Sequence, residues 1–184
     1  MNSLSTIRNQ KSYADSPIPE ILAPAGNRES FLAALAAGAD AVYCGMKHFS
    51  ARMMAKNFSL EELGSLTQLA HDMGIKVYVA LNSLLKPDDL NKAARLTEAL
   101  KRWVKPDAII IQDLSFLRLV RQTGFSGELH LSTLANVSFP AALKFIYGNL
   151  GIDRVVVPRE LNIDEVKALA KACPDGLGLE VFIH

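Results

Sequence analysis

Residues 76–113 read KVYVALNSLLKPDDLNKAARLTEALKRWVKPDAIIIQD and hold a complete strand–helix–strand pattern. The two ends of this stretch, KVYVALN (76–82) and AIIIQD (108–113), are short aliphatic runs with little polar alternation. Such runs are typical of parallel strands that are buried on both faces. Between them, Pro87 and Asp88 precede a run whose apolar residues recur at helical spacing. The stretch therefore predicts one βα unit followed by the next strand of a parallel sheet.

The same pattern recurs on both sides of this stretch. The five further apolar runs are EILAPAG (20–26), AVYCG (41–45), ELHLST (128–133), RVVVPRE (154–160) and LEVFIH (179–184). Amphipathic segments separate these runs, and seven strands with six helices between them predict a parallel α/β fold. Both an open doubly wound sheet and a (β/α)8 barrel fit this alternation. No GxGxxG sequence follows the first run and the repeat keeps one direction, so we expect a TIM-like (β/α) barrel.

The number of predicted strands is smaller than a closed barrel needs. A complete barrel has eight strands and typically about 250 residues, whereas this chain has 184. We therefore expect a disordered N-terminal tail over residues 1–18 and an incomplete barrel over residues 19–184, truncated after strand seven. The first and seventh strands of such a barrel expose unpaired backbone edges. These open edges predict self-association or the docking of a complementing C-terminal half.

Composition narrows the class of protein. Hydrophobic residues make up 49% of the chain and its net charge is +1, which indicates a globular protein without a general attraction to nucleic acid or membranes. No apolar run reaches the roughly 20 residues that cross a bilayer, and the start of the chain lacks a secretory signal. Cys44 and Cys173 are too far apart in sequence to indicate a disulfide framework or a zinc site, and we expect both to be buried. We predict a cytoplasmic protein without a metal site.

Polar residues follow the predicted strands, at the end of the barrel where active sites of this architecture lie. We take Glu160, Glu180 and His184, from the last two strands, as catalytic candidates. At a closed mouth these groups would be buried and their acidity shifted, as general acids and bases require. A buried Glu180 carboxylate needs a partner, and we predict that this partner is Arg159. The alternative for Glu160 is a structural ion pair with Arg159.

A second set of strand-end residues is expected to contact the substrate. This set consists of Asn27, Arg52, Asn82, Asp113, Ser132 and Arg159. Structural alternatives stay open for several members, because Asn27 and Asp113 could each cap the helix that follows. Ser132 and its neighbour His130 could be core polar residues. The loop around Arg52 could bind an anion or could simply be a solvated loop.

Three segments of the sequence resemble one known family. They are ILAPAGNRESFLAALAAGADAVYCG (21–45), VVVPRELNIDEV (155–166) and EVFIH (180–184). Together they are similar to peptidase family U32, also called collagenase-like proteases, and the resemblance covers nearly all of residues 20–184. The resemblance implies a TIM-like barrel and a peptidase, and so a peptide substrate. By motif, Glu180 and His184 match the signature strand, Arg159 and Glu160 match an Arg-Glu pair, and Arg52 matches a basic loop position.

The same family is also similar to proteins of anaerobic-type hydroxylation. These include enzymes implicated in hydroxylating tRNA uridine or ribosomal RNA cytidine with prephenate, and in ubiquinone hydroxylation. That branch is associated with a 4Fe–4S cluster, whose cysteines follow directly after the Glu-x-Phe-x-His strand in the family pattern. The resemblance implies such a cluster for a full-length member and none for this chain, since Cys44 and Cys173 do not match those positions. Leu134 also departs from the pattern, because many members have glutamine there.

Three functions therefore stay open for this chain. The first is a U32 peptidase-like protein, present here as a fragment. The second is part of a prephenate-dependent, iron–sulfur enzyme that hydroxylates tRNA or rRNA, and the third is a non-catalytic barrel half that needs a partner. No HExxH helix and no nucleophile-elbow sequence indicates a particular peptidase mechanism. The sequence leaves open whether the chain is itself an enzyme.

Overall fold

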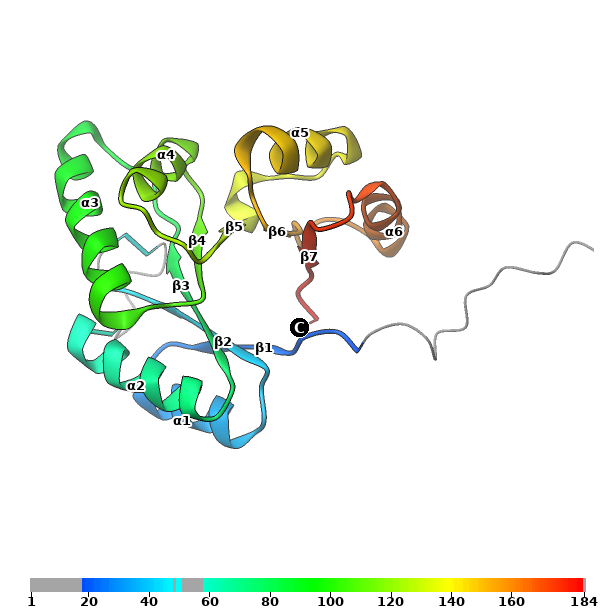
Figure 1. The fold of residues 1–184 in the computed structure, drawn as a ribbon. Helices are drawn as coiled ribbons and strands as arrows, with labels where there is room; N and C mark the ends of the chain where they lie inside the picture. Colours follow the sequence, from blue (N-terminus) through cyan, green and yellow to red (C-terminus); the bar gives the residue numbers. More distant parts are fainter. Residues whose placement is uncertain (1–17, 48, 51–57, 184) are drawn as a thin grey trace, which may run out of the picture.

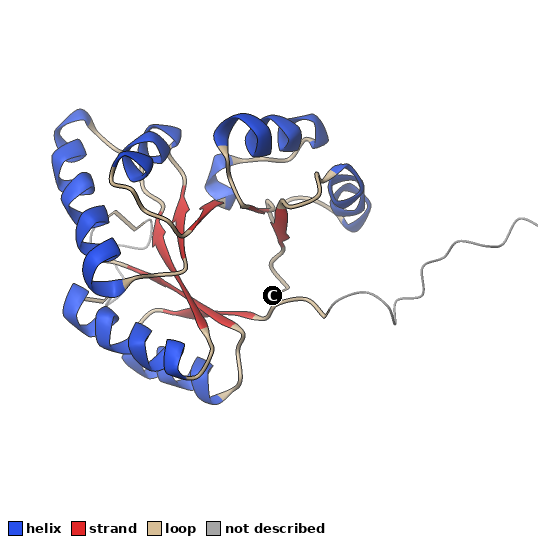
Figure 2. Cartoon of the chain, viewed as in Figure 1, coloured by secondary structure: helices blue, strands red, loops and turns tan. Residues whose placement is uncertain are grey.

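The strands and helices alternate along the chain and form one curled sheet. The computed structural model describes residues 18–47, 49–50 and 58–183. Within these residues, seven parallel strands follow one another in the order β1 to β7, and each pairs with the next. The helices lie on the outer side of the curve (Figures 1 and 2). This half-barrel confirms the predicted α/β, TIM-like arrangement of seven parallel strands.

Each strand overlaps a predicted apolar run, but the last two end early, RVVVPRE (154–160) at Val156 and LEVFIH (179–184) at Glu180. The strands are β1 (Leu22–Ala25), β2 (Ala41–Gly45), β3 (Lys76–Leu81), β4 (Ala108–Ile111), β5 (Glu128–Leu131), β6 (Arg154–Val156) and β7 (Gly178–Glu180). The helices are α1 (Arg28–Ala36), α2 (Leu60–Asp72), α3 (Leu90–Ala99), α4 (Leu114–Gln122), α5 (Pro140–Leu150) and α6 (Ile163–Ala172). A π-helical turn, Leu100–Val104, continues α3. In the described sheet, β1 and β7 lie at the two ends of the strand order.

Side-chain caps and glycines set where the helices begin and end. The side chain of Asn27 accepts a hydrogen bond from the Ser30 N–H at the start of α1, and Ser59 caps α2 in the same way. Gly74 and Gly124 follow α2 and α4 with φ of 74° and 68°, a left-handed conformation that costs glycine little. These signals return the chain from each helix to the next strand.

Alternation along the strands divides the apolar residues into two clusters. The larger cluster fills the space between the outer face of the sheet and the helices, and includes Phe31, Phe116 and Leu143. A smaller cluster lies on the inner face of the sheet and contains Ala41, Tyr78, Ala80, Ala108 and Ile110. The inner face is therefore packed by side chains at its middle and becomes polar toward both ends, as in barrels of this type.

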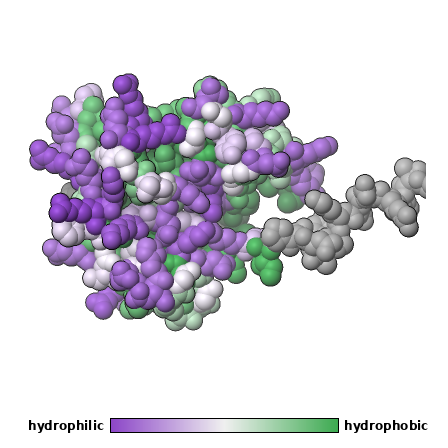
Figure 3. All heavy atoms as spheres, in the orientation of Figure 1, coloured by the Kyte–Doolittle hydropathy of each residue, from purple (hydrophilic) through white to green (hydrophobic). Residues whose placement is uncertain are grey.

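Three further features are the predicted N-terminal tail, the hydropathy of the surface and the length of the helices. The predicted tail over residues 1–18 lies outside the described residues except for Ile18, which is exposed. Figure 3 shows that the face seen in Figure 1 is largely hydrophilic over the outer helices. None of the helices that the structure describes has the length and apolar character needed to cross a membrane.

Candidate functional site

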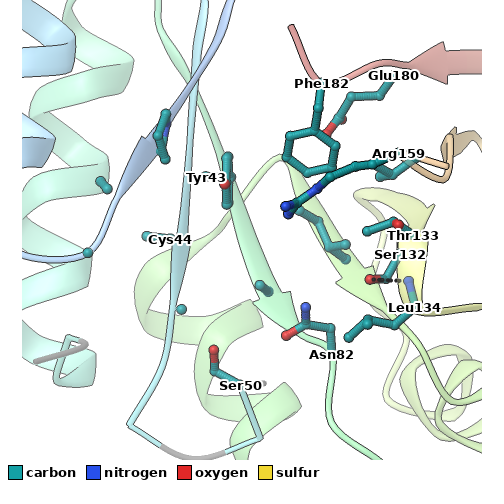
Figure 4. A pocket seen from close by; sticks show the side chains of 17 residues that line it. Tyr43, Cys44, Ser50, Asn82, Ser132, Thr133, Leu134, Arg159, Glu180 and Phe182 are labelled. Carbon is teal, nitrogen blue, oxygen red and sulfur yellow. Dashed lines mark hydrogen bonds between the residues drawn. The ribbon is translucent and has the colours of Figure 1, made fainter. Parts of the chain in front are cut away.

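A pocket opens at the carboxyl ends of the strands. Its cavity measures about 270 Å³, and every strand or the loop after it contributes to the lining (Figure 4). Apolar side chains on the inner face of the sheet form part of its wall, among them Pro24, Ala80, Ile110 and Val156. This is the position where the sequence predicted a site, and the cavity is large enough for a single ring-sized group.

Polar groups enter this pocket from several strands. Asn82 follows β3, and Ser132 and Thr133 follow β5. Ser132 is buried, and its Oγ accepts a hydrogen bond from the Leu134 N–H at 3.3 Å. Tyr43, from β2, faces these residues across the cavity (Figure 4). The pocket therefore combines an apolar wall with a few hydrogen-bonding groups, which is typical of small-molecule sites.

Arg159 and Phe182 form one unit at the mouth of the pocket. The Arg159 guanidinium carbon lies 4.4 Å from the centroid of the Phe182 ring. Figure 4 shows both side chains reaching into the pocket from the side opposite Tyr43. A guanidinium held flat on a ring keeps its N–H groups at the edge, where they can donate to an anion. Arg159 is also exposed, so a ligand can reach it from solvent.

Glu180 is the acidic residue of the pocket lining. Its side chain is only 15% exposed, and its Oε2 lies 3.7 Å from Arg154 Nη1. Burial raises the pKa of the Glu180 carboxyl, the Arg154 charge lowers it and Glu20 raises it, with a net increase. The predicted partner was wrong, because the arginine beside Glu180 is Arg154 and not Arg159. Arg159 lies beyond the end of β6 and stacks on Phe182 instead.

A cluster of charged side chains lies next to Glu180, on the side of the pocket that faces the amino ends of the strands. Arg154 Nη1 donates to Glu20 Oε1 at 2.7 Å, and the Tyr78 hydroxyl donates to the same oxygen at 2.8 Å. Lys76 Nζ lies 3.3 Å from Glu20 Oε2. Burial would raise the pKa of Glu20, but these hydrogen bonds and charges lower it from 4.5 to about 2. The cluster joins the segment before β1 to β3 and β6.

The low pKa of Glu20 predicts a loss of stability in acid. Because the folded pKa lies near 2 and the unfolded value near 4.5, the stabilisation is present above pH 4.5 and is lost as pH falls toward 2. At neutral pH we expect the free energy of unfolding of the wild type to exceed that of Glu20→Gln by about 1 to 2 kcal/mol, after allowing for solvent screening. Urea unfolding of both proteins from pH 7 to pH 2 measures this gap. A gap that stays constant over that range would contradict the assignment.

His130 lies on the inner face of β5 and is fully buried. Burial lowers its pKa, so the neutral ring donates its Nε2–H to Glu128 Oε2 at 2.8 Å. Its Nδ1 is buried and has no hydrogen-bond partner among the described groups. The ring also packs edge-on against Tyr78, with centroids 4.7 Å apart. His130 is therefore a core residue in which only Nε2 has a hydrogen-bond partner among the described groups. That partner is Glu128 and not Ser132.

The predicted site residues fall into four groups. Asn82, Ser132, Arg159 and Glu180 line the pocket together. Asn27 and Asp113 cap α1 and α4, and Asp113 Oδ2 also accepts from the Leu85 N–H. Glu160 was expected to be buried at the mouth; it is exposed and is not part of the pocket lining. Arg52 and His184 lie outside the described residues.

The capping position of Asn27 leads to a stability prediction. Its Oδ1 accepts from the Ser30 N–H at 2.8 Å, and the Ser30 hydroxyl in turn accepts from the Asn27 N–H at 3.2 Å. We expect Asn27→Ala to lower the free energy of unfolding by about 1 kcal/mol, which chemical denaturation can measure. Asn27→Asp, which keeps a capping oxygen, is the matched control and should cost little. Equal losses in both variants would contradict the capping role.

Sequence reasoning did not select several residues that shape the site. Tyr43 and Phe182 supply its aromatic rings, and Glu20 and Arg154 supply the charges next to Glu180. Strand alternation gives a signal for three of them. Tyr43 shares the inner face with Ala41, Arg154 with Val156, and Phe182 with Glu180, each two positions apart. Glu20, just before β1, carries the same signal, because it alternates with Leu22 and Pro24 of the inner face.

The described residues do not fit the cysteine-held cluster that the resemblance implies for a full-length member. Cys44 is buried in β2, where burial raises the pKa of its thiol to about 12. Cys173 ends α6; it was expected to be buried but is only half-buried, and its thiol donates to the Leu177 carbonyl oxygen at 3.2 Å. In the described ranges, no group of three His, Cys, Asp or Glu residues could hold a metal ion. No step of the chemistry is therefore assigned to such a cluster.

Comparison with known proteins gives consistent matches over this chain. The sequence profile of peptidase family U32 matches residues 26–184. The tRNA hydroxylation protein P of Haemophilus influenzae is 36% identical over 90% of this chain and 35% of its own length. The 23S rRNA 5-hydroxycytidine C2501 synthase of Escherichia coli is 37% identical over 90% of this chain and 24% of its own length. The collagenase of Porphyromonas gingivalis is 36% identical over 90% of this chain and 41% of its own length.

The structural comparison supports the fold. A solved U32 peptidase superposes with a TM-score of 0.74 and 18% identity, covering 98% of this chain and 73% of that protein. At this identity the likeness concerns the fold alone. The three relatives by sequence are much longer, and this chain spans about a quarter to two fifths of their length.

Proposed function

This chain belongs to peptidase family U32, and from that membership we propose that it forms the substrate-binding part of an enzyme that hydroxylates a pyrimidine base of RNA. Relatives named for tRNA hydroxylation and for rRNA 5-hydroxycytidine synthesis support this proposal. The observation that carries it is the pocket itself, a cavity of about 270 Å³ with an apolar wall, hydrogen-bonding groups and one arginine at its mouth. Such a cavity suits one base that has left its stack.

Each kind of group in the pocket has a task in this proposal. Tyr43 and Phe182 offer ring faces on which a base can stack, and Asn82 and Ser132 lie where its polar edge would be read. Arg159, stacked on Phe182, binds the phosphate of the nucleotide whose base occupies the pocket. Glu180 is the group in the lining whose raised pKa suits the transfer of a proton. The remaining chemistry needs groups that the described residues do not supply.

The peptidase reading has weaker support from the geometry. The relative named collagenase favours it by sequence. In the pocket, however, the buried Ser132 hydroxyl is bound by the Leu134 N–H, and the neighbouring His130 is bound to Glu128. A serine nucleophile donates its hydroxyl hydrogen to a general base, and no such bond from Ser132 is found among the described residues. This arrangement leaves Ser132 a binding residue.

A nucleotide titration tests the proposed binding role. Uridine or cytidine monophosphate added to the chain should shift the NMR signals of Tyr43, Ser132 and Arg159, and ribose 5-phosphate, which lacks the base, should shift them much less. Arg159→Gln should weaken nucleotide binding about tenfold, the loss expected for one charged hydrogen bond. Shifts from a collagen-like peptide and none from the nucleotides would refute the proposal and support the peptidase.

The two end strands give a proposal about partners. In the described sheet β1 and β7 lie at the ends of the strand order, and the exposed residues beside them include Ile21, Val181 and Ile183. We propose that these edges pair with a further segment, either from a second copy or from a complementing C-terminal half. The mass in solution, measured by light scattering, should then exceed that of one chain at micromolar concentration. A cytoplasmic location stays a prediction.

A further inference from the structure

The Glu180 carboxyl shares one guanidinium with a second acid that lies outside the pocket. Arg154 Nη1 is 2.7 Å from Glu20 Oε1 and 3.7 Å from Glu180 Oε2. The shorter contact is a hydrogen bond, whereas Glu180 Oε2 is buried and has no hydrogen-bond partner among the described groups. One nitrogen of Arg154 therefore faces both acids, but it donates to Glu20 alone.

The surroundings of Glu20 explain why it holds the guanidinium. Glu20 also accepts from the Tyr78 hydroxyl at 2.8 Å and lies 3.3 Å from Lys76 Nζ. The Arg154 guanidinium lies over the Tyr78 ring, with its carbon 5.2 Å from the ring centroid. Three partners therefore fix Glu20, and the ring fixes Arg154 beside it. Moving the guanidinium toward Glu180 would break this set.

The other charged groups around Glu180 do not replace Arg154. Among the described residues, the titratable and charged groups on the inner face around it are Glu20, Tyr43, Tyr78, His130, Arg154 and Arg159. Arg159 is stacked on Phe182, and the neutral His130 donates to Glu128. β4 contributes only Ala108 and Ile110 to this face. The charge state of Glu180 therefore depends on how Glu20 and Arg154 are paired.

We propose that Glu20 and Arg154 are positioning residues for Glu180: the fold binds the guanidinium to Glu20 and so leaves the pocket carboxyl able to take up and release a proton. Glu20 acts from the opposite end of the sheet and touches no ligand in the pocket. Without this hold on the guanidinium, Arg154 would move from its 3.7 Å contact into a hydrogen bond with Glu180 and keep that carboxyl ionised. The inference deepens the role proposed for Glu180, but it can be tested without any substrate.

The test follows the Glu180 carboxyl directly by NMR. The side-chain carboxyl carbon of Glu180, identified by its absence in Glu180→Gln, is titrated in the wild type and in Glu20→Gln. We expect the pKa of Glu180 to fall by about one unit or more in Glu20→Gln, because Arg154 can then donate to Glu180 and the repulsion from Glu20 is gone. Glu128→Gln removes a glutamate whose hydrogen-bond partner is the neutral His130, and should leave the Glu180 titration unchanged.

A milder variant keeps the test decisive if Glu20→Gln does not fold. Glu20→Asp retains the charge but shortens the side chain by one methylene, which weakens its hold on Arg154. We expect its Glu180 pKa to lie between those of the wild type and Glu20→Gln. A Glu180 titration that is the same in the wild type and in each folded Glu20 variant would overturn the inference. Because no ligand is involved, failure of nucleotide binding leaves this result intact.

Discussion

Arg154→Met is expected to lower the free energy of unfolding by about 3 kcal/mol, the lower end of the cost of breaking a buried ion pair. Arg154 is only 17% exposed, and its guanidinium contacts Glu20 and Glu180. Methionine fills much of the same volume, so the loss comes from charge rather than from a cavity. The variant leaves two carboxyls close together without their common cation. Urea unfolding at pH 7 measures the effect.

Two further variants separate charge from packing. Arg118→Met removes an exposed arginine of α4, for which no ion pair is found in the described part of the chain, and should change stability by less than about 0.5 kcal/mol. Adding Glu20→Gln to Arg154→Met removes the uncompensated carboxylate, and should recover part of the loss. If the double variant is as unstable as the sum of the two single variants, the pair is not coupled as its 2.7 Å contact indicates.

The sequence predicted the architecture because its signals are local. Aliphatic runs such as AIIIQD become fully buried strands in a parallel sheet, and β4 is buried at all four positions. Caps such as Asn27 and Asp113 act within three residues of their own position. The helix through residues 90–104 was also expected, but its last turn is π-helical from Leu100 to Val104, a change of register that apolar spacing alone does not reveal.

The pairing of Glu180 shows where sequence reasoning failed. Arg159 was chosen because it follows the sixth predicted strand, at the end of the barrel where the site was expected. β6 ends at Val156, and the register places Val156 beside Glu180 and Arg154 beside Gly178. The inner face of β6 thus carries Arg154 and Val156, whereas Arg159 lies past the strand. Counting by two from Val156 would have pointed to Arg154.

Contacts across the barrel interior could not be derived in the same way. Glu20 and Arg154 are 134 residues apart in sequence and meet only because the sheet curls. Strand alternation fixes the face on which a side chain lies, but the neighbour across the interior depends on curvature and on side-chain length. The same reason explains why Tyr43 and Phe182 were not predicted as walls of one pocket. The sequence therefore predicted the end of the barrel at which the pocket lies, but not the two aromatic residues that face each other across it.

Under the proposed function, Glu180→Gln is expected to reduce RNA hydroxylation by a factor of about 10² to 10⁴, the range for loss of a general acid or base. The amide keeps the size of the side chain and its place in the pocket lining, but cannot exchange a proton. Its control is Glu160→Gln, which removes the other acid that the sequence selected. Glu160 is exposed and outside the pocket lining, so its variant should retain activity within about twofold.

The comparison is made on the longer protein that carries this sequence, in a host strain without its own tRNA and rRNA hydroxylation proteins. Mass spectrometry of RNA nucleosides then measures pyrimidines that are heavier by one oxygen atom. Binding of uridine monophosphate should be nearly unchanged in both variants, because Glu180 is proposed to act on the proton rather than on affinity. If Glu180→Gln were as active as Glu160→Gln, the proton-transfer role would be refuted. A parallel loss of nucleotide binding would instead assign Glu180 to binding, since catalysis by proton transfer stabilises the transition state and not the bound substrate.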